Sequence, residues 1–172
     1  MEIVKWYTVD EMKSAIDEFV KKFDDGTLDG VGDAELFFKA IVGAAYASKE
    51  SDDEDKQEYW ENLESDLEEY ESLGYFIEVR GTEKKFILKF TPKEQKLALY
   101  SGEYDPKAIE PVKHVIWMDW TAPTQLKIMK GNPNTDAEFF SGDCKVDGSL
   151  KLASKPRSWI YDFFDFIERE VD

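Results

Sequence analysis

The sequence predicts an α+β fold, in which a helical first part is followed by a small sheet and further helices. Up to residue 74, apolar side chains recur every three or four residues, as on one face of a helix. At Gly74 the period changes to two, which is typical of strands, and five β-prone stretches follow. We therefore expect an N-terminal helical segment, residues 1–74, packed on a main domain of residues 75–172 in one compact unit.

Three helices are predicted in the first 74 residues from their start signals. Thr8-Val9-Asp10-Glu11 has the form of a capping box, and Ser51-Asp52-Asp53-Glu54 repeats it. Asp33 can cap a helix between the two. The apolar stripes after these starts are Met12, Ile16, Phe19, Val20 and Phe23; Leu36, Phe37, Ala40, Ile41, Ala44 and Ala45; and Tyr59, Trp60, Leu63, Leu67 and Tyr70.

Short strands and helices are predicted to alternate after Gly74. The first three strands form a meander, because turn signals separate them. An irregular connection at 101–111, which contains two prolines, leads to the fourth strand. The expected strands are 75–80, 86–90, 96–100, 112–120 and 144–147, and the expected helices are 123–129, 135–140, a short one from Ser149, and one from Pro156 to Ile167.

The charge balance excludes several classes of partner. Because 38 acidic residues stand against 22 basic ones, the net charge is −16. A chain this acidic repels the phosphates of nucleic acids, and its sign also argues against electrostatic docking on anionic membranes. No apolar run has the length of a membrane span. We expect neither a nucleic-acid partner nor integral membrane association.

Cysteine usage and the N-terminus indicate the compartment. The chain has one cysteine, Cys144, so a disulfide within the chain is impossible and a reducing compartment is the default. The opening MEIVKWYTVDEMK lacks the basic-then-apolar pattern of a secretion signal. We expect a cytoplasmic protein.

Residues for catalysis are few, and we expect no catalytic site. His114 is the single histidine, so Ser-His-Asp or Cys-His chemistry would have to use it, and no nucleophile-elbow pattern is present. A packed or surface histidine is the plainer interpretation. Cys144 is more typical of a small core residue than of a reactive thiol. A small hydrolase or transferase that uses His114 stays open as an alternative.

Metal and cofactor sites are not expected either. One histidine and one cysteine cannot supply a four-ligand zinc site. Asp25-Gly26-Thr27-Leu28-Asp29-Gly30 fits the start of a calcium loop, but Leu36 stands where a bidentate Glu is needed. This stretch is more typical of a loop between helices. No glycine-rich phosphate cradle follows a strand.

Aromatic side chains are crowded into the last third of the chain. They either fill a core or line a hollow between sheet and helices, and the residues alone leave both interpretations open. The crowded residues are Trp117, Trp120, Phe139, Phe140, Trp159, Phe163 and Phe164.

This region resembles the sterol carrier protein-2 family of lipid-binding domains. The family's recurring segment has a helix ending in Leu-x-x-Met-x-Gly, then paired aromatics, then a Gly-Lys-Leu-Lys-Ile-x-Gly strand, then a helix with a small residue near its start. The resemblance covers about residues 75–155, although Asp143 and Cys144 replace the family's basic-apolar pair. The matching residues are Leu126, Met129, Gly131, Phe139, Phe140, Gly142, Lys145, Val146, Gly148 and Ala153.

The resemblance implies a five-stranded, mostly antiparallel sheet with one face covered by helices, here with an extra N-terminal helical segment. It also implies an apolar tunnel between sheet and helices that takes fatty acyl chains, sterol-like molecules or other lipids without covalent chemistry. The expected lining residues are Trp117, Trp120, Leu126, Met129, Phe139, Phe140, Val146, Leu150, Trp159 and Phe163.

The expected function is therefore non-catalytic binding or carriage of a lipid or other apolar small molecule, with no cofactor and no metal. One rival is an interaction or regulatory module that keeps this fold but fills the tunnel with its own side chains. The abundance of large aromatics points toward that rival. The sequence also leaves a homodimer open.

Overall fold

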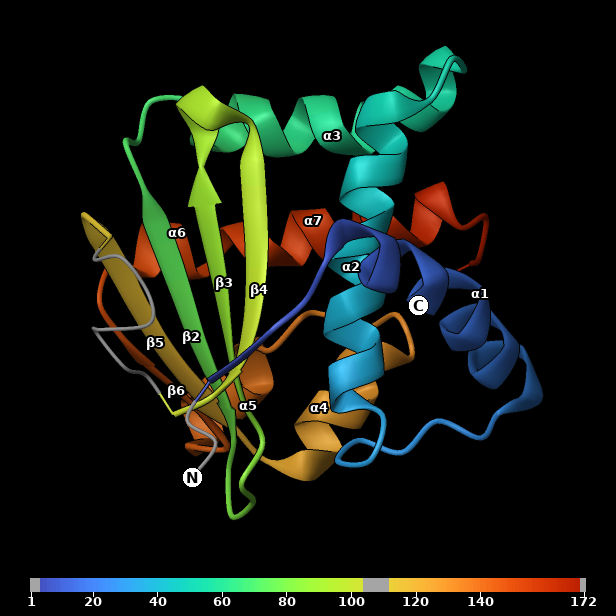
Figure 1. Ribbon diagram of the computed structural model, residues 1–172. Coiled ribbons are helices and arrows are strands. Elements are labelled where there is room, and N and C mark those ends of the chain that lie inside the picture. The colour runs from blue at the N-terminus through green and yellow to red at the C-terminus, as the bar shows by residue number, and fades with distance from the viewer. Residues whose placement is uncertain (1–3, 104–111, 171–172) are drawn as a thin grey trace.

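A six-stranded mixed sheet forms one layer of the molecule (Figure 1). The computed structural model describes residues 4–103 and 112–170, so most of the irregular connection expected at 101–111 lies outside the described residues. The strands are β1 (Val4–Trp6), β2 (Leu73–Val79), β3 (Lys85–Thr91), β4 (Lys96–Gly102), β5 (His114–Trp120) and β6 (Cys144–Asp147). Their order in the sheet is β1-β4-β3-β2-β5-β6.

The sheet contains the five expected strands and one more. The added strand is β1, whose Trp6 pairs with Tyr100 of β4, so the expected count of five is corrected to six. A strand of three residues is too short to show a period of two in the sequence, which explains the omission. Four of the five strand pairings are antiparallel, and β2 and β5 run parallel.

Helices are present at each of the expected positions. They are α1 (Val9–Asp25), α2 (Ala34–Glu50), α3 (Glu54–Leu67), α4 (Ala122–Met129), α5 (Asp136–Ser141), α6 (Leu150–Ala153) and α7 (Lys155–Phe166), with a short 3-10 turn η1 (Pro92–Glu94) before β4. Proline at the start of α7 fits the first turn of a helix, where its missing N–H costs no hydrogen bond.

One of the two expected capping boxes is formed, and the other is wrong. The backbone N–H of Glu11 donates to the Thr8 hydroxyl at 3.1 Å, and the Glu11 carboxylate accepts from the Thr8 backbone. At α3 the cap is Asp53, whose carboxylate accepts from Asp55 N at 2.9 Å. Ser51, two residues before this cap, instead accepts from the backbone N–H of Asp53.

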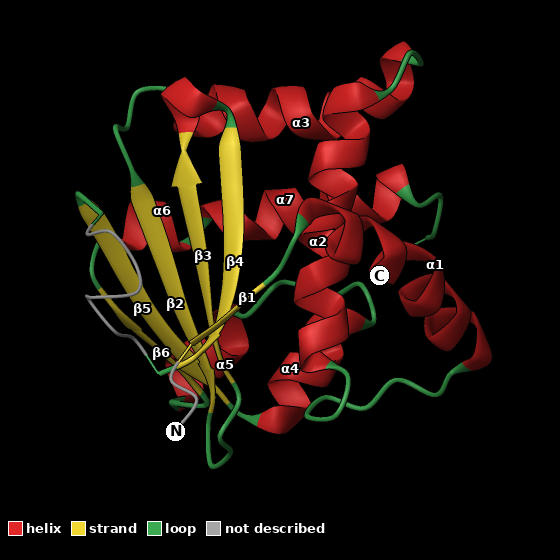
Figure 2. Cartoon of the chain, viewed as in Figure 1, coloured by secondary structure: helices red, strands yellow, loops and turns green. Residues whose placement is uncertain are grey.

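Helix α2 is the central element of the core, between α1 and the sheet (Figure 2). Eleven of its 17 residues are buried, because it has neighbours on several sides. Toward the sheet, the ring of Phe38 lies 4.7 Å from that of Phe86. The Tyr46 hydroxyl donates to Leu97 O and accepts from Leu97 N, which ties α2 to β4. The N-terminal helices therefore share one core with the sheet.

The two faces of the sheet differ in what covers them. On the inner face, alternate residues of the strands join the same buried cluster as the helices. On the outer face, Phe76 and Ile87 form a separate small cluster with Tyr100 and Val115. A pocket is present on the inner face, where the sheet meets α2 and the C-terminal helices.

Candidate functional site

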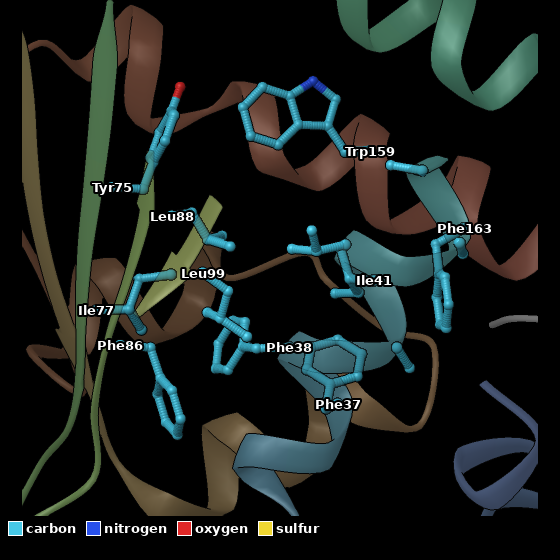
Figure 3. Close-up of a cluster of buried hydrophobic side chains, with 14 of the residues drawn as sticks. Phe37, Phe38, Ile41, Tyr75, Ile77, Phe86, Leu88, Leu99, Trp159 and Phe163 are labelled. Atoms are coloured by element: carbon cyan, nitrogen blue, oxygen red, sulfur yellow. The ribbon is translucent and has the colours of Figure 1, made fainter. Parts of the chain in front are cut away.

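The inner face of the sheet and the C-terminal helices enclose a pocket of about 380 Å³. Its floor is formed by Ile77 of β2, Leu88 of β3 and Met118 of β5, all of which point to the same side of the sheet. In Figure 3, Ile77 and Leu88 extend from the strands toward Ile41 of α2. The volume lies within the usual range for small-molecule sites.

The walls come from five helices and from the edge strand β6, and they are mainly apolar. The two residues of β6 that face inward, Cys144 and Val146, lie on the same side of that strand, because alternate residues of a strand share a face. The wall residues are Phe37, Phe38 and Ile41 of α2, Ile128 of α4, Phe139 and Phe140 of α5, Leu150 and Ala153 of α6, Pro156, Trp159 and Ile160 of α7, and Trp120 of β5.

The polar part of the lining is gathered between α5 and α7. Arg157 Nη2 lies 2.5 Å from Asp136 Oδ1, and these two are the charged residues among the described lining residues. Because they form an ion pair, their charges largely cancel at this side of the pocket. Thr135 and Ser154 supply the neighbouring hydroxyl groups.

Helix α5 has only six residues, and it is held in place by a side chain of α4 and by Arg80, which follows β2. Lys127 Nζ of α4 lies 2.6 Å from Glu138 Oε1. The Arg80 guanidinium donates to Gly142 O at 2.9 Å, and Gly142 ends the helix with a φ of 88°, a conformation that favours glycine. These contacts fix the two phenylalanines of α5 beside the pocket.

Three of the apolar lining side chains are also exposed to solvent, so they mark the mouth of the pocket. Phe140 is 85% exposed, Leu150 60% and Phe139 40%. We call these three residues the apolar rim. The rings of Phe139 and Phe140 contact each other edge-on at 5.7 Å.

Trp159 forms the wall on the α7 side and contacts the sheet. Its ring meets Tyr75 edge-on at 5.2 Å, and the Tyr75 hydroxyl donates to Leu152 O at 2.8 Å. The indole nitrogen has no hydrogen-bond partner within the described part of the chain. In Figure 3 this nitrogen lies on the side of the ring away from Leu88 and Ile41.

Six of the ten expected lining residues lie at this pocket, and four do not. Trp117 lies on the outer face of the sheet, where it is 47% exposed and its ring is 4.3 Å from that of Phe76. Its strand position already predicts this, because residues three apart on a strand face opposite sides and Trp120 faces inward. The six at the pocket are Trp120, Phe139, Phe140, Val146, Leu150 and Trp159.

The other three expected residues are core residues beside the pocket. Met129 and Phe163 are fully buried, and the Phe163 ring lies 5.6 Å from that of Phe19 in α1. Leu126 packs against the same core and lies close to Gly30 in the loop before α2. The resemblance implies a lining role for all three, and the helical spacing of apolar residues does not distinguish a cavity wall from solid packing.

The floor of the pocket and its α2 wall are not among the lining residues expected from the sequence. Strand alternation could have placed Ile77, Leu88 and Met118 on one face, since all three lie in expected strands. The contribution of Phe38 and Ile41 carries no such signal, because it depends on how α2 crosses the sheet.

The titratable groups of the chain give the pocket little reactive chemistry. Burial raises the pKa of the Cys144 thiol, with a smaller opposing effect of the Thr135 hydroxyl, so the thiol is protonated near neutral pH. His114 lies outside the pocket lining, exposed at the start of β5, with its ring 5.1 Å from that of Tyr70.

The loop that partly fits a calcium site uses its acids for internal contacts. Asp33 pairs with Lys22 at 2.9 Å and accepts from Asp29 N at 2.8 Å, and Asp29 accepts from Gly32 N. Among residues 4–103 and 112–170, no three or more His, Cys, Asp or Glu side chains are grouped to hold a metal ion.

Across the described ranges, none of the helices combines the length and the apolar character needed to cross a bilayer.

Comparisons with known proteins give structural likenesses to two solved chains. No protein-family model matches the sequence, and no curated protein matches it. A solved structure of a UbiJ-SCP2 ubiquinone synthesis protein is similar at a TM-score of 0.43 and 16% sequence identity, over 59% of this chain and 75% of the other. A likeness this distant carries no conclusion about the function of this chain.

Proposed function

We propose that this protein binds an apolar ligand, such as a fatty acyl chain, a sterol-like molecule or another lipid, in the pocket between sheet and helices. The observation that carries the proposal is a hollow of about 380 Å³ with a mainly apolar lining and an open mouth. Each methylene moved from water into such a site contributes about 0.8 kcal/mol, from which the cost of association is subtracted. The resemblance of this region to sterol carrier protein-2 domains agrees with it.

The positions of Trp117, Phe163 and Phe164 favour a ligand site over a tunnel filled by side chains. Phe163 and Phe164 pack away from the pocket, where both contact the ring of Phe19. Trp117 is on the outer face of the sheet. Because these side chains occupy other places, the space between Ile77 and Trp159 is not closed by them.

The proposed binding is non-catalytic. The thiol nearest to a ligand, that of Cys144, is kept protonated by burial. Asp136 and Arg157 neutralise each other, and His114 lies outside the pocket lining. These features support carriage or storage of the ligand rather than its conversion.

Filling the pocket tests the proposal. Ala153 lines it from α6, so Ala153→Trp introduces an indole into the hollow and should weaken binding of a fluorescent fatty acid at least about tenfold. Ala137→Trp is the matched control, because Ala137 is exposed on α5 and is not a lining residue. Circular dichroism shows whether both variants stay folded.

The wild-type protein provides the decisive comparison. If it takes up no fluorescent fatty acid, and native mass spectrometry of the purified protein finds no co-purified apolar molecule, the proposal is wrong. Equal uptake by the wild type and by folded Ala153→Trp would move the ligand site away from this pocket.

A further inference from the structure

The apolar rim is a surface that the pocket alone does not explain. In the part of the chain that the structure describes, five large apolar side chains are exposed, and Phe139, Phe140 and Leu150 are three of them. They lie together at the mouth of one pocket rather than scattered over the surface. Transfer of their exposed surface from water to an apolar phase is favourable.

The charge of the chain is divided unevenly around this rim. Between Lys127 and Arg157, six basic residues stand against four acidic ones, although the whole chain carries −16. Between Asp52 and Glu71, which includes α3, eleven acidic residues stand against one basic residue. The acidity of the molecule is therefore concentrated in another segment.

The acidic segment and α5 lie at opposite ends of the sheet (Figure 1). Helix α3 leads into β2 at Leu73, whereas α5 leads into β6 at Cys144, which pairs with Trp120 beside Val79 at the far end of β2. Six residue steps along a strand span about 20 Å. Because the Debye length is about 8 Å at physiological ionic strength, a surface at α5 is largely screened from the charge of α3.

We propose that the apolar rim docks on a lipid bilayer that carries anionic headgroups, with the mouth of the pocket turned toward the bilayer. The aromatic and aliphatic side chains of the rim enter the boundary between headgroups and acyl chains. The exposed Lys151, which is adjacent to Leu150, contacts the anionic headgroups. The net charge of −16 argues against such docking only if the charge is spread evenly, and here it is not.

Docking of this kind does not depend on the pocket holding a lipid, so the two proposals are tested separately. Vesicle flotation measures docking, with vesicles of phosphatidylcholine alone or mixed with phosphatidylglycerol, at low and at high salt. Uptake of a fluorescent fatty acid in the absence of vesicles measures the pocket. Folded Ala153→Trp should lose uptake and still float with the mixed vesicles.

Two variants test the rim and its charges. The double variant Phe140→Ser/Leu150→Ser should bind the mixed vesicles at least about tenfold more weakly than the wild type. Trp6→Ser is the control, because Trp6 is 61% exposed on β1, away from the rim, and its loss should change vesicle binding little. Lys151→Glu should weaken the preference for phosphatidylglycerol and leave fatty-acid uptake unchanged. Lys145→Glu is its control, because Lys145 lies on the opposite face of β6 from Cys144 and Val146.

The outcomes separate cleanly. Wild-type flotation with the mixed vesicles that weakens in high salt and in the rim variant supports docking. If the wild type does not float with these vesicles at low salt, or if the folded rim variant floats equally well, docking at the rim is wrong, whatever the uptake measurement shows.

Discussion

At the scale of single residues, Asp162 is a partly buried carboxylate between two helices, where its negative charge is unfavourable. It lies on α7 and accepts a hydrogen bond of 3.3 Å from Asn62 of α3. Burial raises its pKa from 3.8 to about 6, the Asn62 hydrogen bond partly opposes this, and nearby Asp165, Glu58 and Asp66 raise the pKa further. Ionised Asp162 therefore opposes folding at neutral pH.

The sign of this effect is fixed by proton linkage. Between pH 6 and pH 3.8 the folded state holds more protons at Asp162 than the unfolded state does, so this residue makes folding more favourable as pH falls through that window. Above pH 6 the carboxylate is charged in both states, and the cost of burying it is at its full value.

We predict that Asp162→Asn raises the free energy of unfolding at pH 7 by about 1 kcal/mol, a value reduced for partial exposure. The gain should shrink toward zero near pH 4, where the carboxyl group of the wild type is protonated in the folded state. Urea unfolding at both pH values measures it. Asp17→Asn, at an exposed position of α1, is the control, and an equal gain there would point to net charge instead of burial.

At the scale of elements, α1 and α2 approach each other most closely at Gly43. A Cβ added to this glycine would lie 2.2 Å from the backbone oxygen of Met12, well inside van der Waals contact. The α1 backbone therefore lies directly on the α2 backbone, and any side chain at this position must push the helices apart.

We predict that Gly43→Ala lowers the free energy of unfolding by about 1 to 3 kcal/mol, even though alanine favours helices more than glycine does. Hydrogen exchange should accelerate in α1 more than in the sheet, because α1 is the element displaced. Gly81→Ala is the control. Its added Cβ meets open space, but its φ of 77° is unfavourable for alanine. This variant should therefore lower the free energy of unfolding without faster hydrogen exchange in α1. An unchanged or stabilised Gly43→Ala would contradict the close approach.

The elements themselves could largely be predicted from the sequence. The change of period at Gly74 located the sheet, and the Thr8 capping box located α1, because both depend on neighbours within a few residues. Strand β1 and the cap of α3 at Asp53 could not be predicted this way. β1 has only three residues, and several acids in a row offer competing caps.

At the scale of the whole molecule, the pocket depends on contacts between segments far apart in the sequence. Phe38 and Ile41 of α2 face Val146 and Trp159 across a separation of about a hundred residues. The local sequence shows that each of these side chains is apolar, but it does not indicate which other side chain each one contacts. That is why the C-terminal half of the lining could be predicted in part and the α2 half could not.

The same long-range contacts decide whether residues 75–172 can fold alone. Phe86 of β3 is covered by Phe38 of α2. The backbone N–H and C=O of Leu97 in β4 are both hydrogen-bonded to the hydroxyl of Tyr46 in α2. Removing residues 1–74 would expose the inner face of β3 and β4 to water and leave these groups unpaired. The strands would then bury less apolar surface on that face, and this burial is what offsets the loss of chain entropy on folding.

We predict that a chain of residues 75–172 has no cooperative unfolding transition and binds a dye for exposed apolar surface, whereas the full chain unfolds in one transition. Near-UV circular dichroism and a two-dimensional amide spectrum measure the difference, since fixed aromatic packing is lost when the sheet has no helix to pack on. Adding residues 1–74 in trans should restore the signal if the two parts recognise each other. A well-dispersed amide spectrum from residues 75–172 alone would contradict this prediction. It would show that the sheet folds without α2, and that the α2 wall is not required for the rest of the pocket to form.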